Sequence, residues 1–194
     1  MNISEIVKDW NSVYKEIFDT EADFSKVYIP PIPIMGKWRL LFILKAIKMG
    51  FSYQVCQKLF EIRSYCDDLD KDISINSRSP VESYAIWVRD EPSPTQEFLG
   101  KTIAVDPKMG KGITLLERII FEIKYFTETG QHLDVKGQTF CSGSRNASGF
   151  FPTVDLNNQS EVDIFWHAPD FFYQGFGIRE VVSMENFNRV YVKP

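Results

Sequence analysis

Cysteine is scarce in this chain of 194 residues, and no two cysteines have the Cys-x-x-Cys spacing of a metal or redox motif. The three cysteines are Cys56, Cys66 and Cys141. If one helix carries Cys56 and Cys66, the two lie about 15 Å apart along its axis, which is too far for a disulfide bond. We therefore expect three free thiols, a state typical of the reducing cytoplasm.

Long apolar runs are also lacking. The longest strongly apolar run, at positions 40–44, has five residues, whereas a helix needs about twenty to cross a bilayer. The first five residues contain neither a basic segment nor an apolar one, so they do not resemble a secretory signal. The sequence thus predicts a protein without a membrane partner and with a cytoplasmic location.

Charge of one sign is not in excess. The chain has 22 basic and 26 acidic residues, which gives a formal net charge of −4. Binding to a nucleic-acid backbone depends on basic groups that neutralise phosphates, so this chain is a poor candidate for it. The composition, with 44% hydrophobic and 25% charged residues, is typical of a globular protein and excludes general disorder.

Complete metal-binding motifs are absent as well. Asp68, Asp70 and Asp72 have the spacing of the opening of a calcium-binding loop. Ile73 and Ser79, however, occupy the positions where such a loop requires glycine and glutamate. The sequence therefore predicts no metal, and we find no signature of a cofactor.

Two segments have the periodicity of amphipathic helices. The segment 115–128 is preceded by a capping box formed by Thr114 and Glu117, and Gly130 is suited to end it. Phe121 and Tyr125 lie off its apolar stripe, so this helix is either covered on two sides or presents an aromatic patch. The other segment has apolar residues at three- and four-residue steps, namely Ile3, Ile6, Val7, Trp10, Val13, Tyr14, Ile17 and Phe18.

The segment 38–44 is compatible with two structures. Its leucines favour a helix, whereas its short continuous apolar run suits a strand that is buried on both faces. We favour the strand because the run is short. Residues 84–89 form a clearer strand, since they are rich in aromatic and β-branched side chains.

After position 137 the sequence changes to short strands separated by turn residues. The expected strands are 138–141, 153–156, 162–166, 178–182 and 189–192. We predict an α+β fold, in which a mainly antiparallel sheet is backed by two or three helices. The sheet combines this C-terminal meander with the strands near 38–44 and 84–89.

The length of 194 residues favours one domain over the whole chain, 1–194. Within it, residues 1–35 form an N-terminal helix and a connector rich in proline. Residues 36–134 form a mixed α/β part, and residues 135–194 form a β-rich part. Pro30, Pro31 and Pro33 exclude a helix from the connector and predict an extended chain.

Several segments resemble a family of small uncharacterised bacterial proteins. The more specific ones are His-Leu-Asp at 132–134 and Ser-Gly-Ser-Arg at 142–145. The resemblance covers most of residues 38–182, and it implies a bacterial origin without implying a reaction. The segments that carry it are 84–90, 112–118, 124–134, 141–145 and 148–154.

One set of residues has the types needed for nucleophilic catalysis. Cys141 would be the nucleophile, His132 or His167 its base, and Asp134 the carboxylate that orients the base. Against this, a histidine after a helix end can simply interact with the last carbonyl groups. Cys141 also lies in an apolar segment, where a buried thiol is inert. A small hydrolase or transferase that uses Cys141, His132 and Asp134 is therefore our second hypothesis.

Arg145 is the only lysine or arginine between positions 137 and 178. It follows Ser142 and Ser144, whose hydroxyl groups could join the guanidinium in holding an anion. The alternative is an ion pair between Arg145 and a nearby carboxylate, and the abundance of local acids favours this alternative. The nearby carboxylates are those of Asp155, Glu161, Asp163 and Asp170.

The leading functional hypothesis is a non-catalytic binding or interaction module. Its ligand would be a small anion or a partner protein, held at the aromatic end of the sheet that carries Arg145.

Overall fold

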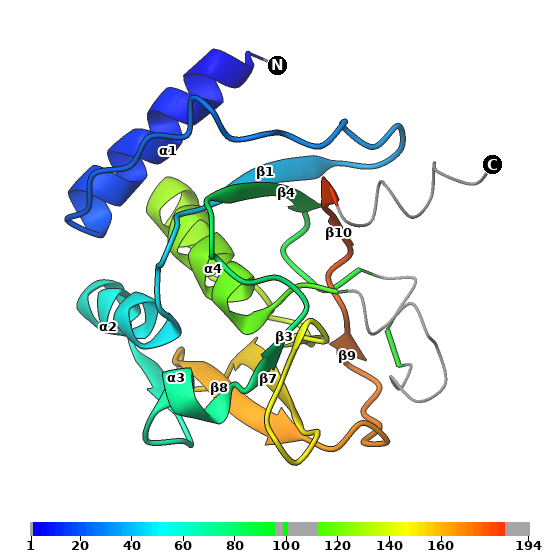
Figure 1. Cartoon of the computed structure of the whole chain (residues 1–194). Coiled ribbons are helices and arrows are strands. Elements are labelled where there is room, and N and C mark those ends of the chain that lie inside the picture. Colours follow the sequence, from blue (N-terminus) through cyan, green and yellow to red (C-terminus); the bar gives the residue numbers. More distant parts are fainter. Residues whose placement is uncertain (1, 96–98, 101–111, 185–194) are drawn as a thin grey trace.

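The computed structural model describes residues 2–95, 99–100 and 112–184, which fold into helices and mixed sheets (Figure 1). This confirms the predicted α+β class. The helices are α1 (Ile3–Ile17), α2 (Met49–Leu59), α3 (Leu69–Asp72) and α4 (Leu115–Thr129). The strands are β1 (Trp38–Ile43), β2 (Ile62–Ser64), β3 (Ile75–Asn76), β4 (Tyr84–Arg89), β5 (Gln138–Phe140), β6 (Ser144–Arg145), β7 (Phe151–Leu156), β8 (Val162–His167), β9 (Phe176–Gly177) and β10 (Val181–Val182).

The segment 38–44, for which both a helix and a strand were considered, contains the strand β1. It pairs antiparallel with β4, and β10 pairs with the other side of β4, which gives a three-stranded sheet. The last four residues of β1, from Leu40 to Ile43, are all buried. A strand that is covered on both faces accounts for this continuous apolar run.

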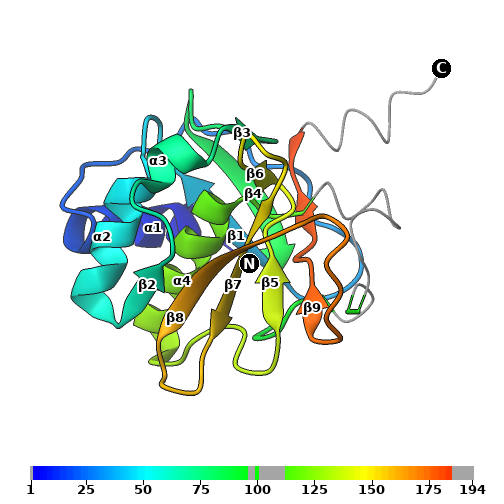
Figure 2. The ribbon, with the colours of Figure 1, turned by 90° about the horizontal axis from the view of Figure 1, so that it is seen from below.

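The second sheet has the order β2-β8-β7-β5-β9, and Figure 2 shows its strands side by side. Its centre, β5-β7-β8, is the predicted antiparallel meander. Its two outer pairs, β2 with β8 and β5 with β9, are parallel, which the sequence did not predict. The prediction that this meander shares one sheet with the strands near 38–44 and 84–89 is wrong, because β1 and β4 lie in the separate three-stranded sheet. The prediction of a single strand at 178–182 is wrong. Two short strands, β9 and β10, lie on either side of Arg179 and belong to different sheets. The expected strand 189–192 lies outside the described residues.

Helix α4 lies between the two sheets (Figure 1). The predicted capping box is present, and Gly130 ends the helix with a left-handed φ of 66°. Every residue from Glu117 to Lys124 is buried. Of the two alternatives for this helix, coverage on two sides is therefore correct, and Phe121 is fully buried.

Helix α1 covers the opposite face of the three-stranded sheet. The Trp10 indole donates to the carbonyl oxygen of Leu40 at 3.1 Å, and the Tyr14 hydroxyl donates to that of Phe42 at 2.9 Å. One cluster of buried apolar residues extends from α1 to β10. None of the helices in the described part of the chain is both long and apolar enough to cross a membrane.

Candidate functional site

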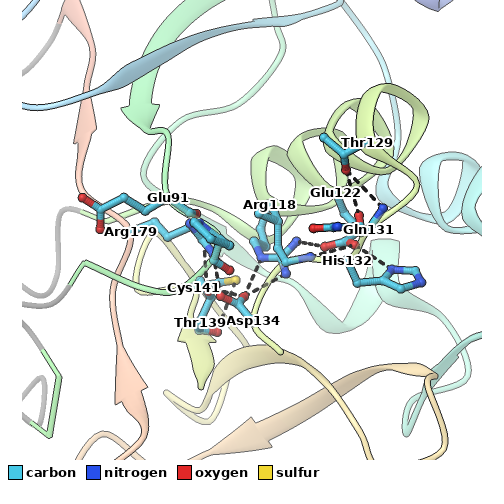
Figure 3. Close-up of polar contacts among 12 residues, drawn as sticks. Glu91, Arg118, Glu122, Thr129, Gln131, His132, Asp134, Thr139, Cys141 and Arg179 are labelled. Atoms are coloured by element: carbon cyan, nitrogen blue, oxygen red, sulfur yellow. Dashed lines mark hydrogen bonds and ion pairs between the residues drawn. The ribbon is translucent and has the colours of Figure 1, made fainter. Parts of the chain in front are cut away.

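The three residues of the catalytic hypothesis lie in one region, below α4 (Figure 3). Among the described residues, however, no hydrogen bond joins Cys141, His132 or Asp134 to another of the three. The His132 Nδ1 atom is 2.9 Å from the Glu122 carboxylate, and the Cys141 thiol faces the carbonyl oxygen of Thr139 at 3.9 Å. The structure thus brings these residues near one another without building a relay. His167 lies elsewhere, on β8, where its ring stacks on Phe171.

The environment of Cys141 also opposes nucleophilic catalysis. The residue is 0% exposed. Burial raises the pKa of its thiol well above the ordinary value, and the nearby Asp134 carboxylate acts in the same direction. Because the thiolate is the reactive form, this environment does not favour an activated nucleophile, and the catalytic hypothesis stays a prediction.

Asp134 instead belongs to a buried ion network that the sequence analysis missed. We define this network as Arg118, Glu122, Asp134 and Arg179, each of which is 0% exposed. Arg118 donates to Asp134 from Nε at 3.0 Å and from Nη2 at 2.8 Å. Its Nη1 atom donates to Glu122 at 2.6 Å. The carboxylates of Asp134 and Glu122 raise the pKa of Arg118, although burial by itself would lower it.

Arg179 completes the buried ion network from the other side. Its Nη2 atom donates to Asp134 at 2.5 Å, and its Nε atom donates to the Thr139 hydroxyl at 3.0 Å. It also donates to the carbonyl oxygens of Glu91 and Pro92. Burial lowers the pKa of Arg179, and the charge of Arg118 adds to this, against the influence of Asp134.

The buried ion network links three parts of the fold, one of which is distant from the other two in the sequence. They are α4, the loop that carries Asp134, and the stretch between β9 and β10 that carries Arg179. The two cations and two carboxylates balance, and each side chain has several partners, as burial of charge requires. This arrangement positions loops rather than receiving a ligand. The signal of this network in the sequence is the spacing of Arg118 and Glu122, which lie one turn apart within an apolar helix.

A second polar cluster lies at the N-terminus of α4. The Glu117 carboxylate accepts from Arg78 at 2.7 and 2.8 Å and from the Tyr84 hydroxyl at 2.9 Å. It also accepts from the Thr114 amide at 2.8 Å, which closes the capping box. Burial raises the pKa of Glu117, but the charge and hydrogen bonds of Arg78 outweigh burial, so the pKa lies below its ordinary value.

A pocket of about 390 Å³ adjoins this cluster, because Arg78 lines it. It lies between the start of α2, the helix α3 and the segment 73–81. Its volume lies near the lower end of the range of small-molecule sites, about 300–1,000 Å³, and both apolar and polar residues line it. The other lining residues are Ala46, Ile47, Lys48, Met49, Leu69, Asp70, Ile73, Asn76, Ser79, Pro80, Val81 and Leu116.

Arg145 lies on β6, which pairs with β3 next to this pocket. Its side chain is exposed, and it forms no ion pair with a described residue. Asp163 and Glu161 pair with Arg63 instead, and Asp155 accepts from a glutamine side chain. The favoured alternative of a local ion pair at Arg145 is therefore wrong for these three acids.

The hydroxyl groups of the two serines in the predicted anion-binding loop form hydrogen bonds inside the protein. The Ser142 hydroxyl accepts from the Gly112 amide at 3.0 Å. The Ser144 hydroxyl accepts from the Leu115 amide at 2.9 Å and donates to Asn76 at 2.6 Å. Both serines are buried. Their hydrogen bonds fix the backbone that leads into α4. The two hydroxyl groups therefore do not join Arg145 in an open anion site.

No family model, curated protein or solved structure matches this chain. The resemblance to bacterial proteins therefore stays a prediction, and the functional argument rests on the geometry of the described residues.

Proposed function

We propose that this protein is a non-catalytic binding module that holds a small, largely apolar molecule with an anionic end. The observation that carries the proposal is the pocket beside the Arg78–Glu117 cluster. The volume of the pocket lies within the range of ligand sites in proteins, and most of its lining residues are apolar. Arg78, which lines the pocket, donates hydrogen bonds to the Glu117 carboxylate and to the carbonyl oxygen of Gly112, so contacts within the protein hold this part of the wall in place.

The polar groups of the pocket favour an anionic end on the ligand. Lys48 is exposed at the pocket and forms no ion pair with any described carboxylate. The Asp70 carboxylate already accepts from the Met49 amide at 2.9 Å, at the start of α2. A carboxylate or sulfonate on the ligand would pair with Lys48, while Ile47 and Ile73 contact its apolar body.

Two fluorescent probes test this proposal. One is 1-anilinonaphthalene-8-sulfonate, which is apolar with an anionic group, and the other is the uncharged N-phenyl-1-naphthylamine. We expect both to bind with saturation, and we expect Ile73→Trp to abolish both because its ring fills the pocket. Lys48→Glu should weaken the anionic probe about fivefold or more and leave the neutral probe unchanged.

A matched control is Val135→Asp, which alters an apolar residue that is 58% exposed and lies outside the pocket lining. It should leave both probes unaffected. If Ile73→Trp folds normally and still binds both probes as the wild type does, the pocket is not the site and the proposal fails.

The non-catalytic part of the proposal is tested at Cys141. We expect iodoacetamide at pH 7 to leave Cys141 unmodified in the folded protein and to modify it after unfolding, as mass spectrometry of the peptide would show. Modification of the folded protein that His132→Ala abolishes would support the hydrolase or transferase hypothesis instead. All three cysteines are free, which supports our proposal of a cytoplasmic location.

A further inference from the structure

The segment between α1 and β1 contains three prolines, Pro30, Pro31 and Pro33 (Figure 1). Each proline has its φ angle held near −65°, and the residue before each proline is restricted to extended conformations. Together these two restrictions cover every residue from 29 to 33. The chain here has little conformational freedom to lose when it binds a partner.

Burial along this segment follows a period of three. Val27, Pro30 and Pro33 are buried or half-buried. The residues that follow each of them are exposed: Tyr28 is 61% exposed, Pro31 is exposed and Ile34 is 99% exposed. A period of three is that of an extended chain of the polyproline II type, and here one side of the segment lies on the protein while another faces solvent.

Hydrogen bonds fix the segment to the three-stranded sheet. The buried indole of Trp87 donates to the carbonyl oxygen of Pro30 at 2.7 Å. The Trp38 indole and the Arg89 guanidinium donate to the carbonyl oxygen of Met35 at 2.6 and 3.2 Å. Gly36, with a φ of 92°, then turns the chain into β1. The exposed residues are thus presented on a fixed support.

The exposed side chains form an apolar strip, which we define as Tyr28, Pro31, Ile32, Ile34 and Met35. Ile32 is 54% and Met35 is 78% exposed. Large apolar side chains that are exposed close together mark an interaction site. Buried side chains on the inner side of the segment show that the exposure is selective and does not reflect a detached chain.

Charge at the two ends of the apolar strip indicates the chemistry of its partner. Lys26 and Lys37 flank the strip, no acidic residue lies between them, and neither forms an ion pair with a described residue. Pro31 is the proline of this segment that is exposed, and exposed prolines dock into grooves lined by aromatic side chains. We infer that the apolar strip binds a partner protein through an aromatic-lined groove with acidic residues at its rim.

The test uses the full chain and a panel of recombinant domains of the SH3, WW and EVH1 types, chosen for acidic groove rims. Calorimetric titration should show saturable binding by at least one domain. Ile34→Asp should weaken this binding about tenfold or more. The substitution removes an apolar contact and places a carboxylate opposite the acidic residues of the groove, which repel it. Lys37→Glu should weaken it about threefold and reduce its dependence on salt.

Val135→Asp provides the matched control, since it also replaces an exposed apolar residue with aspartate, and it should not change binding. Unchanged melting temperatures would show that the variants fold. Absence of binding by every domain, or equal binding by wild type and Ile34→Asp, overturns the inference. So does sedimentation that shows a dimer of this chain which Ile34→Asp converts to a monomer, since a second copy would then cover the strip.

Discussion

Arg118 and Arg145 have the same side chain in opposite surroundings. Arg118 is 0% exposed and contacts the carboxylates of Glu122 and Asp134. Arg145 is exposed and forms no ion pair with a described residue. In the sequence Arg145 stands out, as the single cation of a long segment, whereas Arg118 is one of several charged residues in a helix. The structure reverses this order of importance.

The difference follows from the cost of removing charge from water. A buried guanidinium without partners is strongly destabilising, so burial of Arg118 demands carboxylates and good geometry. An exposed guanidinium is already solvated, and it gains little from an ion pair. The carboxylates near Arg145 in the sequence are therefore free to pair elsewhere, as Asp163 does with Arg63. Four measurements test the contrast between the two arginines and their surroundings.

The largest effect is expected for Arg118→Ala. The substitution leaves Glu122 and Asp134 buried with fewer partners, so the free energy of unfolding should fall by about 3–5 kcal/mol. Denaturation in urea measures it. Arg118→Lys should recover only part of the loss, because lysine lacks the planar fork that contacts two carboxylates. A loss below about 1 kcal/mol for Arg118→Ala would place the network outside the stable core.

Ile119→Ala compares an apolar neighbour on the same helix. Ile119 is 0% exposed, and its truncation should lower the free energy of unfolding by about 2–5 kcal/mol through lost burial and a cavity. Val135→Ala, at a residue that is 58% exposed, serves as the control and should cost under about 0.5 kcal/mol. A small effect at Ile119 would contradict the packing of α4 between the two sheets.

A pH titration contrasts Arg78 with Arg145. Because the pKa of Glu117 is lower in the folded protein than in the unfolded chain, its carboxylate stabilises the fold above the unfolded value of about 4.3. That stabilisation is lost as the pH falls through the folded value. Arg78→Met removes the cation that lowers this pKa, so the midpoint of acid unfolding, followed by circular dichroism, should move to higher pH. Arg145→Met should leave the midpoint unchanged.

The smallest effect is expected for Arg145→Ala. With no ion pair to lose among the described residues, the free energy of unfolding should change by less than about 0.5 kcal/mol. Melting curves with and without sulfate test whether the exposed guanidinium binds an anion, because a bound anion raises the melting temperature of the wild type alone. A loss of several degrees without sulfate would show a structural contact at Arg145.

The elements that could be predicted from the sequence are those whose signals are local. The capping box of Thr114 and Glu117, the left-handed Gly130 and the apolar stripe were sufficient to predict α4. The short apolar run of β1 favoured a strand, and the turn residues after position 137 predicted the strands of the meander. In each case the relevant interactions join residues within one or two turns, or on one face of one strand, so the spacing of residue types contains the information.

Only the tertiary structure decided which polar groups meet. Arg179 reaches Asp134, and Arg78 reaches Glu117, across long stretches of chain. Which carboxylate pairs with which cation depends on where the sheets and α4 place them after water is excluded, and no local spacing encodes this. The same holds for Cys141, whose complete burial raises the pKa of its thiol. Desolvation acts on the assembled core, and residue order alone does not reveal it.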